Sequence, residues 1–218
     1  MFIGHFALAF AAKRAAPRAS LGALFAAAQW SDLLWPVLLL AGVERVTIAP
    51  GDTAFTPLRF DSYPVSHSLL AVVAWSLGAA ALYVVARRDR RTALVLALLV
   101  ASHWALDALT HRPDLPLTLR GTTRVGLGLW RSVPATLLVE GAMFIGAIWL
   151  YTRTTAARDG RGRWGAVALV AFLGVTYLAN VVGPPPPSEG AVAWVTLSMW
   201  LLVAWAAWVD RHRVMRAP

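Results

Sequence analysis

The sequence contains no cysteine and only one lysine, Lys13, among its 218 residues. The lack of cysteine excludes disulfide bonds and thiolate ligands. Charged residues make up only 14% of the chain, whereas a soluble domain of this size carries about 25%. Hydrophobic residues reach 58%. These figures argue against an ordinary soluble domain and favour an integral membrane protein.

The apolar residues come in long runs that are separated by short polar segments. Six of the seven runs are long enough to cross a hydrocarbon core of about 30 Å as helices, and the first is a short half-helix or re-entrant piece. The runs cover residues 2–12, 20–43, 64–86, 92–110, 134–151, 164–182 and 190–209. We therefore expect an all-α fold: a polytopic membrane helix bundle of about six transmembrane helices plus the N-terminal half-helix. No linker divides the chain, so we expect residues 1–218 to form a single integral membrane domain.

The formal net charge is +9, and the basic residues lie in short clusters between the apolar runs. Such clusters are typical of membrane topology signals, so we expect no nucleic-acid partner. The basic segments are 13–18, 87–91, 153–163 and 211–216, and they alternate with near-neutral or acidic loops. This alternation predicts that the C-terminus lies in the cytoplasm. The first apolar run precedes its charges, the reverse of a secretory signal, so we expect it to be retained.

Seven ionisable residues lie within the apolar runs, where each costs about 2.5–3.5 kcal/mol on insertion scales. They are His5, Asp32, His67, His103, Asp107, His111 and Glu140. In "SHWALDALTH" (102–111) two histidines and an aspartate recur every four residues, which places them on one stripe of a helix. The helical rise per residue places most of the group in the outer half of the membrane. We expect these groups to converge, because isolated charges at this depth are poorly tolerated.

Imidazole nitrogens and carboxylate oxygens are ligands of Zn²⁺, Mn²⁺ and Fe²⁺. A divalent ion would neutralise the buried carboxylates, and His-x-x-x-Asp offers two ligands from one helical turn. Simpler interpretations stay open at this point. His103 and Asp107 could form an intrahelical hydrogen-bonded pair, His111 could be a solvated residue at a helix end, and Glu140 could pair with Arg131.

The first half of the chain carries, in order, His5, Asp32 on the next helix, "SHS" at 66–68 and "SHWALDALTHRPDLP" at 102–116. This order resembles a bacterial inner-membrane family of metal-dependent hydrolases, which includes LexA-regulated inner-membrane proteins. That family is distantly similar to zinc-dependent phospholipase C and P1-type nucleases. The family's histidine–arginine pair before "SHS" is absent here, and Asp61 or Tyr63 in "FDSYPVSHS" could replace it.

The resemblance implies a location in the bacterial cytoplasmic (inner) membrane and a divalent metal, with zinc favoured over manganese or iron. The metal ligands that it implies are His5, Asp32, His67, His103 and Asp107, with His111 and Ser68 beside them.

We expect the protein to be a metal-dependent hydrolase, and the depth of the site favours a membrane lipid or lipid-linked phosphoester as substrate. The metal would lower the pKa of a bound water and stabilise charge on phosphoryl oxygens. Glu140, Asp32 or Asp107 would act as general base and His111 as general acid. Arg131 would bind the phosphate from the loop 111–133, which is expected outside although it is rich in arginine.

Two other functions remain as alternatives. An ion- or proton-coupled transporter or permease for small molecules would use the same buried groups to relay charge, with inverted repeats and broken helices as its expected features. Haem or quinone binding would use His67 and His103, with the two rings facing each other across a macrocycle.

Overall fold

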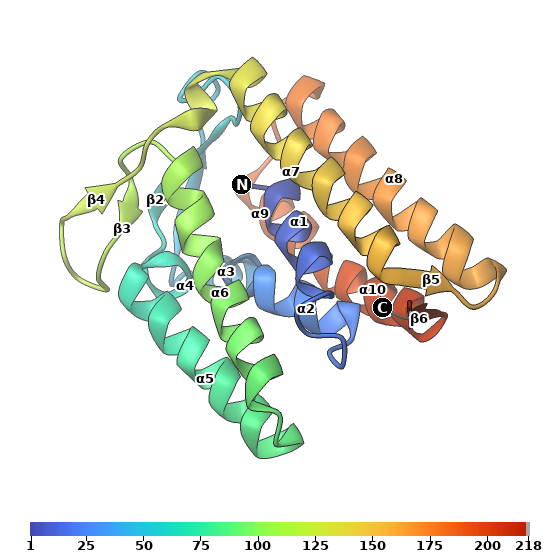
Figure 1. Cartoon of the computed structure of the whole chain (residues 1–218). Helices are drawn as coiled ribbons and strands as arrows, with labels where there is room; N and C mark the ends of the chain where they lie inside the picture. The colour runs from blue at the N-terminus through green and yellow to red at the C-terminus, as the bar shows by residue number, and fades with distance from the viewer. Residues whose placement is uncertain (217–218) are drawn as a thin grey trace.

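The computed structural model describes residues 1–216, and the chain is mostly helical. The helices are α1 (Ile3–Ala12), α2 (Leu21–Ala28), α3 (Trp30–Leu40), α4 (Pro64–His67), α5 (Leu69–Arg87), α6 (Arg90–Thr110), α7 (Val133–Thr154), α8 (Gly160–Val182), α9 (Glu189–Leu197) and α10 (Met199–Arg211), with a 3₁₀ turn η1 at Leu129–Arg131. The expected helical bundle is therefore confirmed in its main part (Figure 1).

Five helical stretches are long and apolar enough to cross a membrane: α5, α6, α7, α8 and the joined pair α9–α10. The pair α2–α3 gives a sixth if its two helices, which meet at 60°, are counted as one span. Large apolar side chains such as Leu82, Val85 and Leu138 are exposed on the outside of these helices. A helix that is apolar on its outer as well as its inner face is typical of a membrane span. The structure thus has five membrane-length helical stretches, or six if α2–α3 is counted as one, and the expected number of about six matches the higher count.

The short helix α1 lies inside the bundle, between α6 and α7 and against α2 (Figure 1). Seven of its ten residues are buried. Phe6 packs at a tilt and Phe10 edge-on against Phe25 of α2, with ring centroids 4.9 and 5.0 Å from that of Phe25. The half-helix expected from the sequence is therefore the centre of the main hydrophobic core, and it carries His5 into the middle of the molecule.

The apolar run 20–43 was expected as one helix, and the structure breaks it. Ser20 caps α2, where its side chain accepts a hydrogen bond from the backbone N–H of Ala23, and the chain leaves helical geometry at Gln29. Pro36 lies inside α3 and has no N–H for the carbonyl of Asp32, four residues earlier. The break and the proline loosen the backbone on both sides of Asp32, which turns this carboxylate toward α6.

Three short antiparallel strand pairs, of which the first two are hairpins, were not predicted. They pair β1 (Arg45–Ile48) with β2 (Leu58–Ser62), β3 (Leu115–Pro116) with β4 (Arg124–Val125), and β5 (Thr155–Ala157) with β6 (Arg213–Met215). The first has an irregular register between Arg45 and Val46. The third joins the segment between α7 and α8 to the C-terminal tail. Each pair is an isolated two-stranded sheet of a few residues, so the all-α class is confirmed.

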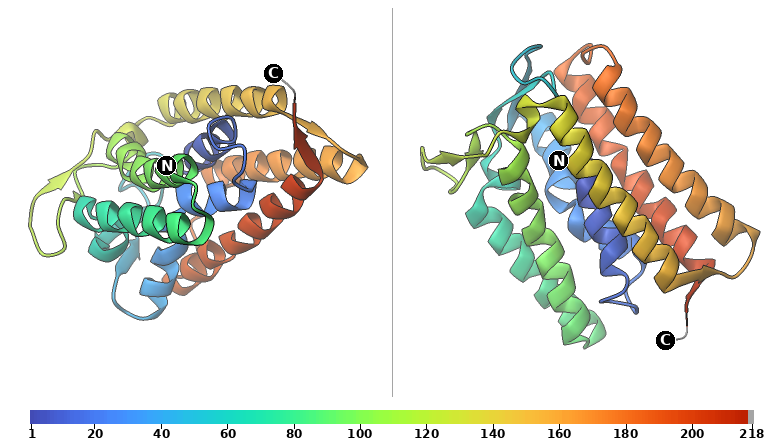
Figure 2. Two further views of the ribbon diagram at one scale, coloured as in Figure 1. Left: turned by 60° about the horizontal axis from the view of Figure 1, so that its bottom comes forward. Right: turned by 45° about the horizontal axis from the view of Figure 1, so that its top comes forward.

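The basic segments collect at one end of the bundle and the first two hairpins at the other (Figures 1 and 2). The hairpin end has its own small core, built around Trp35, Val46, Tyr63, Leu115 and Val192. This separation of charge agrees with the alternation expected from the sequence. The ionisable residues of the apolar runs lie nearer the hairpin end, apart from the basic segments.

Candidate metal centre

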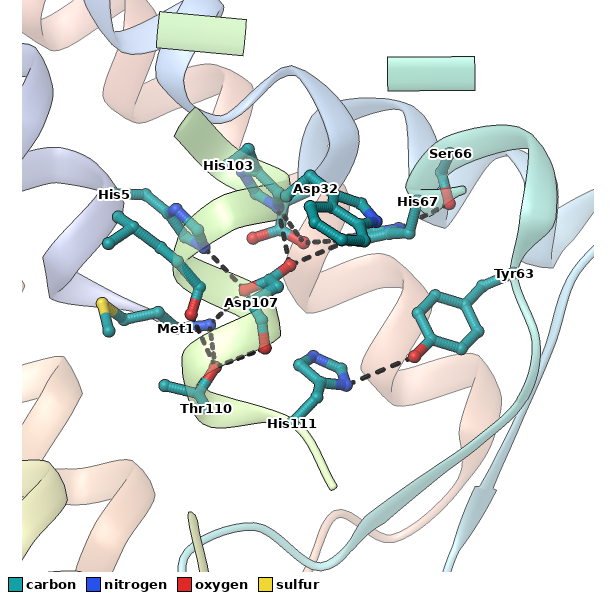
Figure 3. A network of polar contacts seen from close by, with 12 residues as sticks. Met1, His5, Asp32, Tyr63, Ser66, His67, His103, Asp107, Thr110 and His111 are labelled. Carbon is teal, nitrogen blue, oxygen red and sulfur yellow. Dashed lines mark hydrogen bonds and ion pairs between the residues drawn. The ribbon is translucent and has the colours of Figure 1, made fainter. Parts of the chain in front are cut away.

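The structure brings together the five residues predicted as metal ligands. His5 comes from α1, Asp32 from α3, His67 from α4, and His103 and Asp107 from α6. Figure 3 shows their side chains directed toward one another between these four helices. Four of the side chains are at most 4% exposed, and Asp32 is 23% exposed. The cluster is therefore buried and opens on the side of Asp32.

Four atoms of this cluster lie at nearly equal separations. His67 Nε2 is 3.4 Å from Asp32 Oδ1 and 3.7 Å from Asp107 Oδ2. His103 Nε2 is 3.7 Å from the same oxygen of Asp32 and 3.2 Å from the same oxygen of Asp107. Ligand atoms at 2.0–2.2 Å from a tetrahedral ion are about 3.3–3.6 Å from each other. The four separations therefore fit the edges of a tetrahedral site.

His103 presents a free nitrogen to this site. Its Nδ1 lies 2.8 Å from the carbonyl oxygen of Ala28, at the end of α2, so Nδ1 carries the proton and donates it to that oxygen. Its Nε2 is buried and makes no hydrogen bond within residues 1–216. In the neutral ring, Nε2 presents its lone pair to Asp32 and Asp107, and this arrangement is repulsive unless a cation or a proton lies between the nitrogen and the carboxylate oxygens. The residues therefore fit a metal ion.

His67 presents its Nε2 in the same way. Its Nδ1 is 2.6 Å from the hydroxyl of Ser66, and that hydroxyl donates to the buried carboxylate of Glu44. Ser68, the other serine of "SHS", caps α5 by accepting a hydrogen bond from the backbone N–H of Ala71. Its extended backbone ends the short helix α4 directly after His67. The two serines of the motif thus constrain His67 from both sides, Ser66 through a hydrogen bond to its ring and Ser68 by ending its helix.

His5 lies on the other oxygen of Asp107. Its Nε2 is 3.1 Å from Oδ1, and its ring stacks on the ring of His103 with centroids 3.8 Å apart. The amino group of Met1 is 2.6 Å from the same oxygen and 3.4 Å from the hydroxyl of Thr110. Two overlapping ligand groups are therefore present, one made by His5, His103 and Asp107 and one by Asp32, His67 and His103.

His111 does not continue the stripe of His103 and Asp107, because α6 ends at Thr110 and His111 has extended backbone geometry. Its Nδ1 is 3.0 Å from Asp114 Oδ1, and the hydroxyl of Tyr63 donates to that same oxygen. Burial alone would raise the pKa of Asp114, but His111 and Arg112 hold it below its ordinary value. Burial and the neighbouring Asp114 raise the pKa of Tyr63, which keeps its hydroxyl protonated.

Of the two residues considered as replacements for the family's histidine–arginine pair, Tyr63 lies beside the site, with its ring centroid 5.2 Å from that of His67. Asp61 lies on the exposed side of the β1–β2 hairpin, where it accepts hydrogen bonds from Thr47 and Arg59. Asp61 is therefore not part of the cluster.

Glu140 lies at the N-terminus of α1 and does not pair with Arg131. Its Oε2 accepts hydrogen bonds from the backbone N–H groups of Phe2 and Gly4, at 2.9 and 3.1 Å. A carboxylate in this place also interacts favourably with the helix dipole. Its Oε1 is buried without a hydrogen-bond partner in the described part of the chain. This contact could not be predicted from the sequence, because the two segments are far apart along the chain.

Arg131 is exposed in η1, next to Trp130, whose ring lies 4.4 Å from that of His111. Of the other arginines in this loop, Arg112 is bonded to Asp52 and Asp114. Arg120 and Arg124 are exposed. The unusual charge of the loop is therefore partly neutralised, and Arg131 stands close to the residues that surround His111.

The arrangement of His67 and His103 does not suit a haem. Their ring centroids are 5.3 Å apart in an edge-to-face geometry, and both Nε2 atoms face the same two carboxylate oxygens. Bis-histidine ligation places the two rings on opposite sides of a macrocycle. The buried space between these rings cannot hold one.

Besides the contacts of Met1 and Glu140, the contacts missed from the sequence include Glu44 with Ser66, the carbonyl of Ala28 with His103, and Asp114 with His111. Asp114 is the only one with a local signal, since it follows His111 by three residues. Comparisons with protein-family models, with curated proteins and with solved structures find no match for this chain.

Proposed function

We propose that this protein is a membrane-embedded, metal-dependent hydrolase that acts on a lipid or lipid-linked phosphoester, like the family that its sequence resembles. One observation carries the proposal. Two imidazole nitrogens and two carboxylate oxygens face one another in a buried site at 3.2–3.7 Å. Without a metal ion, the amino group of Met1 is paired with the far oxygen of Asp107 only, and Nε2 of His103 has no hydrogen bond in residues 1–216.

The donor set favours zinc, since two imidazoles and two carboxylates in a tetrahedral arrangement are common zinc ligands, and manganese or iron would also accept them. When bound, the metal would supply an acidified water and a positive charge for phosphoryl oxygens. His67, His103, Asp32 and Asp107 would hold it, and His5 would bind the second oxygen of Asp107.

The remaining groups take roles that follow from their places. Asp32 is the most exposed member of the cluster, so its free oxygen is the one that would receive a proton from an incoming water. The Nδ1 of His111 is engaged by Asp114, so Nε2 would give a proton to the leaving group when both ring nitrogens are protonated, which leaves the neutral imidazole behind. Arg131 would bind the phosphate beside Trp130. Glu140 is engaged at the N-terminus of α1, which makes it a weaker candidate for the base than Asp32.

The location supports a lipid substrate. The helices expose apolar faces, and His103 and Asp107 lie in the second half of α6, which leads into the β3–β4 hairpin. By the positive-inside rule, the basic end and the C-terminus would be cytoplasmic, and the site would open toward the outer half of the bacterial inner membrane.

An ion- or proton-coupled transporter remains the second candidate, because the α2–α3 pair is bent by 60° beside Asp32. Transporters with broken helices usually carry a second break in a matching repeat. Residues 1–216 contain one bent pair of this kind. Ion flux into liposomes with purified protein would favour this candidate.

Hydrolysis tests the proposal directly. Purified protein loaded with Zn²⁺ or Mn²⁺ is incubated with mixed micelles of bacterial phospholipids and of undecaprenyl phosphoesters, and phosphate or headgroup release is measured. We expect release by the wild type and none by His103→Ala, with His212→Ala as an active control at the opposite end of the bundle. If the metal-loaded wild type releases nothing from any of these substrates but carries ions across liposomes, the transporter is the better assignment.

A further inference from the structure

Glu44 is a buried carboxylate outside the predicted ligand set. It lies in the short connection between α3 and β1, directly before Arg45, and it is 1% exposed. Its Oε1 accepts hydrogen bonds from the backbone N–H groups of Val65 and Ser66, at 2.7 and 2.9 Å. Its Oε2 accepts one from the hydroxyl of Ser66 at 2.5 Å. These contacts satisfy free N–H groups at the first turn of α4 and join Glu44 to the helix that carries His67.

The direction of the hydrogen bonds determines which nitrogen of His67 is protonated. A serine hydroxyl has one proton, and here it is donated to the carboxylate of Glu44. The hydroxyl oxygen must therefore accept from Nδ1–H of His67, which lies 2.6 Å away. Nε2 is then left unprotonated, and it is this atom that faces Asp32 and Asp107.

The two histidines of the site are held differently. His103 donates its Nδ1–H to a neutral backbone carbonyl, that of Ala28, whereas His67 donates through a hydroxyl to a carboxylate. A carboxylate that accepts the outer proton of a ligating imidazole raises the basicity of the ligand and fixes its orientation. His67 also lies on a helix of only four residues, which cannot by itself hold a side chain in place.

We propose that Glu44 and Ser66 are positioning residues, which set the tautomer and orientation of His67 for metal binding. This inference rests on the proposed metal centre. It explains why a carboxylate is kept in a buried place where it touches none of the predicted ligands directly. It also assigns the first serine of "SHS" a task distinct from that of Ser68, which caps α5.

The variant Glu44→Gln separates an effect on the orientation and tautomer of His67 from an effect on the packing around residue 44. The amide has nearly the same shape, and its oxygen can still accept from Val65 and Ser66. Its NH₂ group, however, would donate to the Ser66 hydroxyl, which would then donate to Nδ1 of His67. This reversal moves the ring proton to Nε2 and blocks that ligand atom.

The experiment measures Zn²⁺ affinity by competition with a chromophoric chelator, the absorption spectrum of the Co²⁺-loaded protein, and the unfolding temperature of the metal-free protein. We expect Glu44→Gln and Ser66→Ala to lower Zn²⁺ affinity by about 10–100-fold and to alter the Co²⁺ bands. The unfolding temperature of metal-free Glu44→Gln should stay near that of the wild type. Ser188→Ala, which removes the exposed cap of α9, should keep wild-type affinity and spectrum.

The inference is overturned if the wild type binds Zn²⁺ and both Glu44→Gln and Ser66→Ala bind it equally well with an unchanged Co²⁺ spectrum. If the wild type itself binds neither ion, the proposed metal centre fails, and the positioning roles fail with it. If Ser66→Ala loses Zn²⁺ affinity but Glu44→Gln does not, the hydroxyl of Ser66 is required but the side chain of residue 44 does not set the direction of its hydrogen bonds. This result would contradict the role assigned to Glu44.

Discussion

His103 and Asp107 stand one turn apart on α6, with Nε2 of the histidine 3.2 Å from Oδ2 of the aspartate. They are not simply an intrahelical hydrogen-bonded pair, since the Nε2 atom has no hydrogen bond in residues 1–216. Each residue is also engaged from outside α6: His103 by Ala28, and Asp107 by His5. His103 and Asp107 are therefore the residues of α6 that α1 and the end of α2 contact in this cluster.

The histidines should differ in their importance for metal binding. His67→Ala removes a nitrogen that faces both carboxylates, so we expect Zn²⁺ affinity to fall by more than about 100-fold, beyond the effect usual for an outer-shell partner. His5→Ala removes a contact to the far oxygen of Asp107 only, and we expect about a 10-fold loss. Calorimetric titration of each variant measures the difference. The reverse order would place the ion between His5, His103 and Asp107 instead.

Glu140 should matter mainly for the attachment of α1. Glu140→Ala leaves the N–H groups of Phe2 and Gly4 without an acceptor, at about 1–3 kcal/mol for each buried group. We expect a clear fall in unfolding temperature in detergent, a smaller fall for Glu140→Gln, and none for Glu189→Ala, which changes an exposed residue on α9. If Glu140→Gln instead abolishes hydrolysis with unchanged stability, Glu140 is the general base.

Asp114 should give stability that depends on pH. Its pKa in the folded protein lies below the ordinary value of 3.8, so its contribution is complete above that value. As the pH falls below 3.8, Asp114 takes up a proton in the unfolded chain before it does so in the folded protein. The stability that Asp114 contributes is therefore lost as the pH falls toward and past its pKa in the folded protein. We expect Asp114→Asn to unfold at a lower temperature than the wild type at pH 7, by about 2–4 °C for each kcal/mol lost.

The difference between wild type and Asp114→Asn should stay constant from pH 7 to pH 5 and shrink below pH about 4. Thermal unfolding at these pH values, followed by intrinsic fluorescence, measures it. A difference that persists unchanged to pH about 2 would mean that the aspartate acts through its shape rather than its charge.

The close approach of α2 and α10 can be tested at Gly22. A Cβ atom there would lie 2.6 Å from the carbonyl oxygen of Val203 and 2.6 Å from Cβ of Ala207. We expect Gly22→Ala to destabilise the fold by about 1–3 kcal/mol, because the backbone of α10 must move. Gly78→Ala on α5 is the control, since its Cβ meets nothing within 4 Å. It should be neutral or stabilise the helix by up to about 1 kcal/mol.

The helices and the convergence of the buried ionisable residues could be predicted from the sequence. Long apolar runs predict where helices such as α6 and α8 lie, because a membrane-spanning helix needs about twenty consecutive apolar residues and such a run is visible in the sequence. Ionisable residues inside those runs are costly, which is why His67, His103 and Asp107 could be expected to meet. Their convergence in the structure follows from that energetic argument and needs no knowledge of loop geometry.

The contacts that tune the site could not be predicted in this way. The break at Gln29 has no glycine or proline beside it, and it follows α2, which packs against α6 and α10. Glu44 reaches Ser66 only because the β1–β2 hairpin folds the chain back, and its strands are too short to give a strong local pattern. Glu140 meets α1 across 136 positions of sequence, which no spacing rule anticipates.

Metal analysis of the purified protein tests the central claim most directly. The wild type, prepared without chelators and dialysed, should retain close to one equivalent of zinc, manganese or iron per chain, as measured by inductively coupled plasma mass spectrometry. A variant carrying His103→Ala and Asp107→Ala should retain almost none, and His212→Ala should match the wild type. Wild-type protein that holds none of these metals, and gains none when they are supplied, would contradict the account.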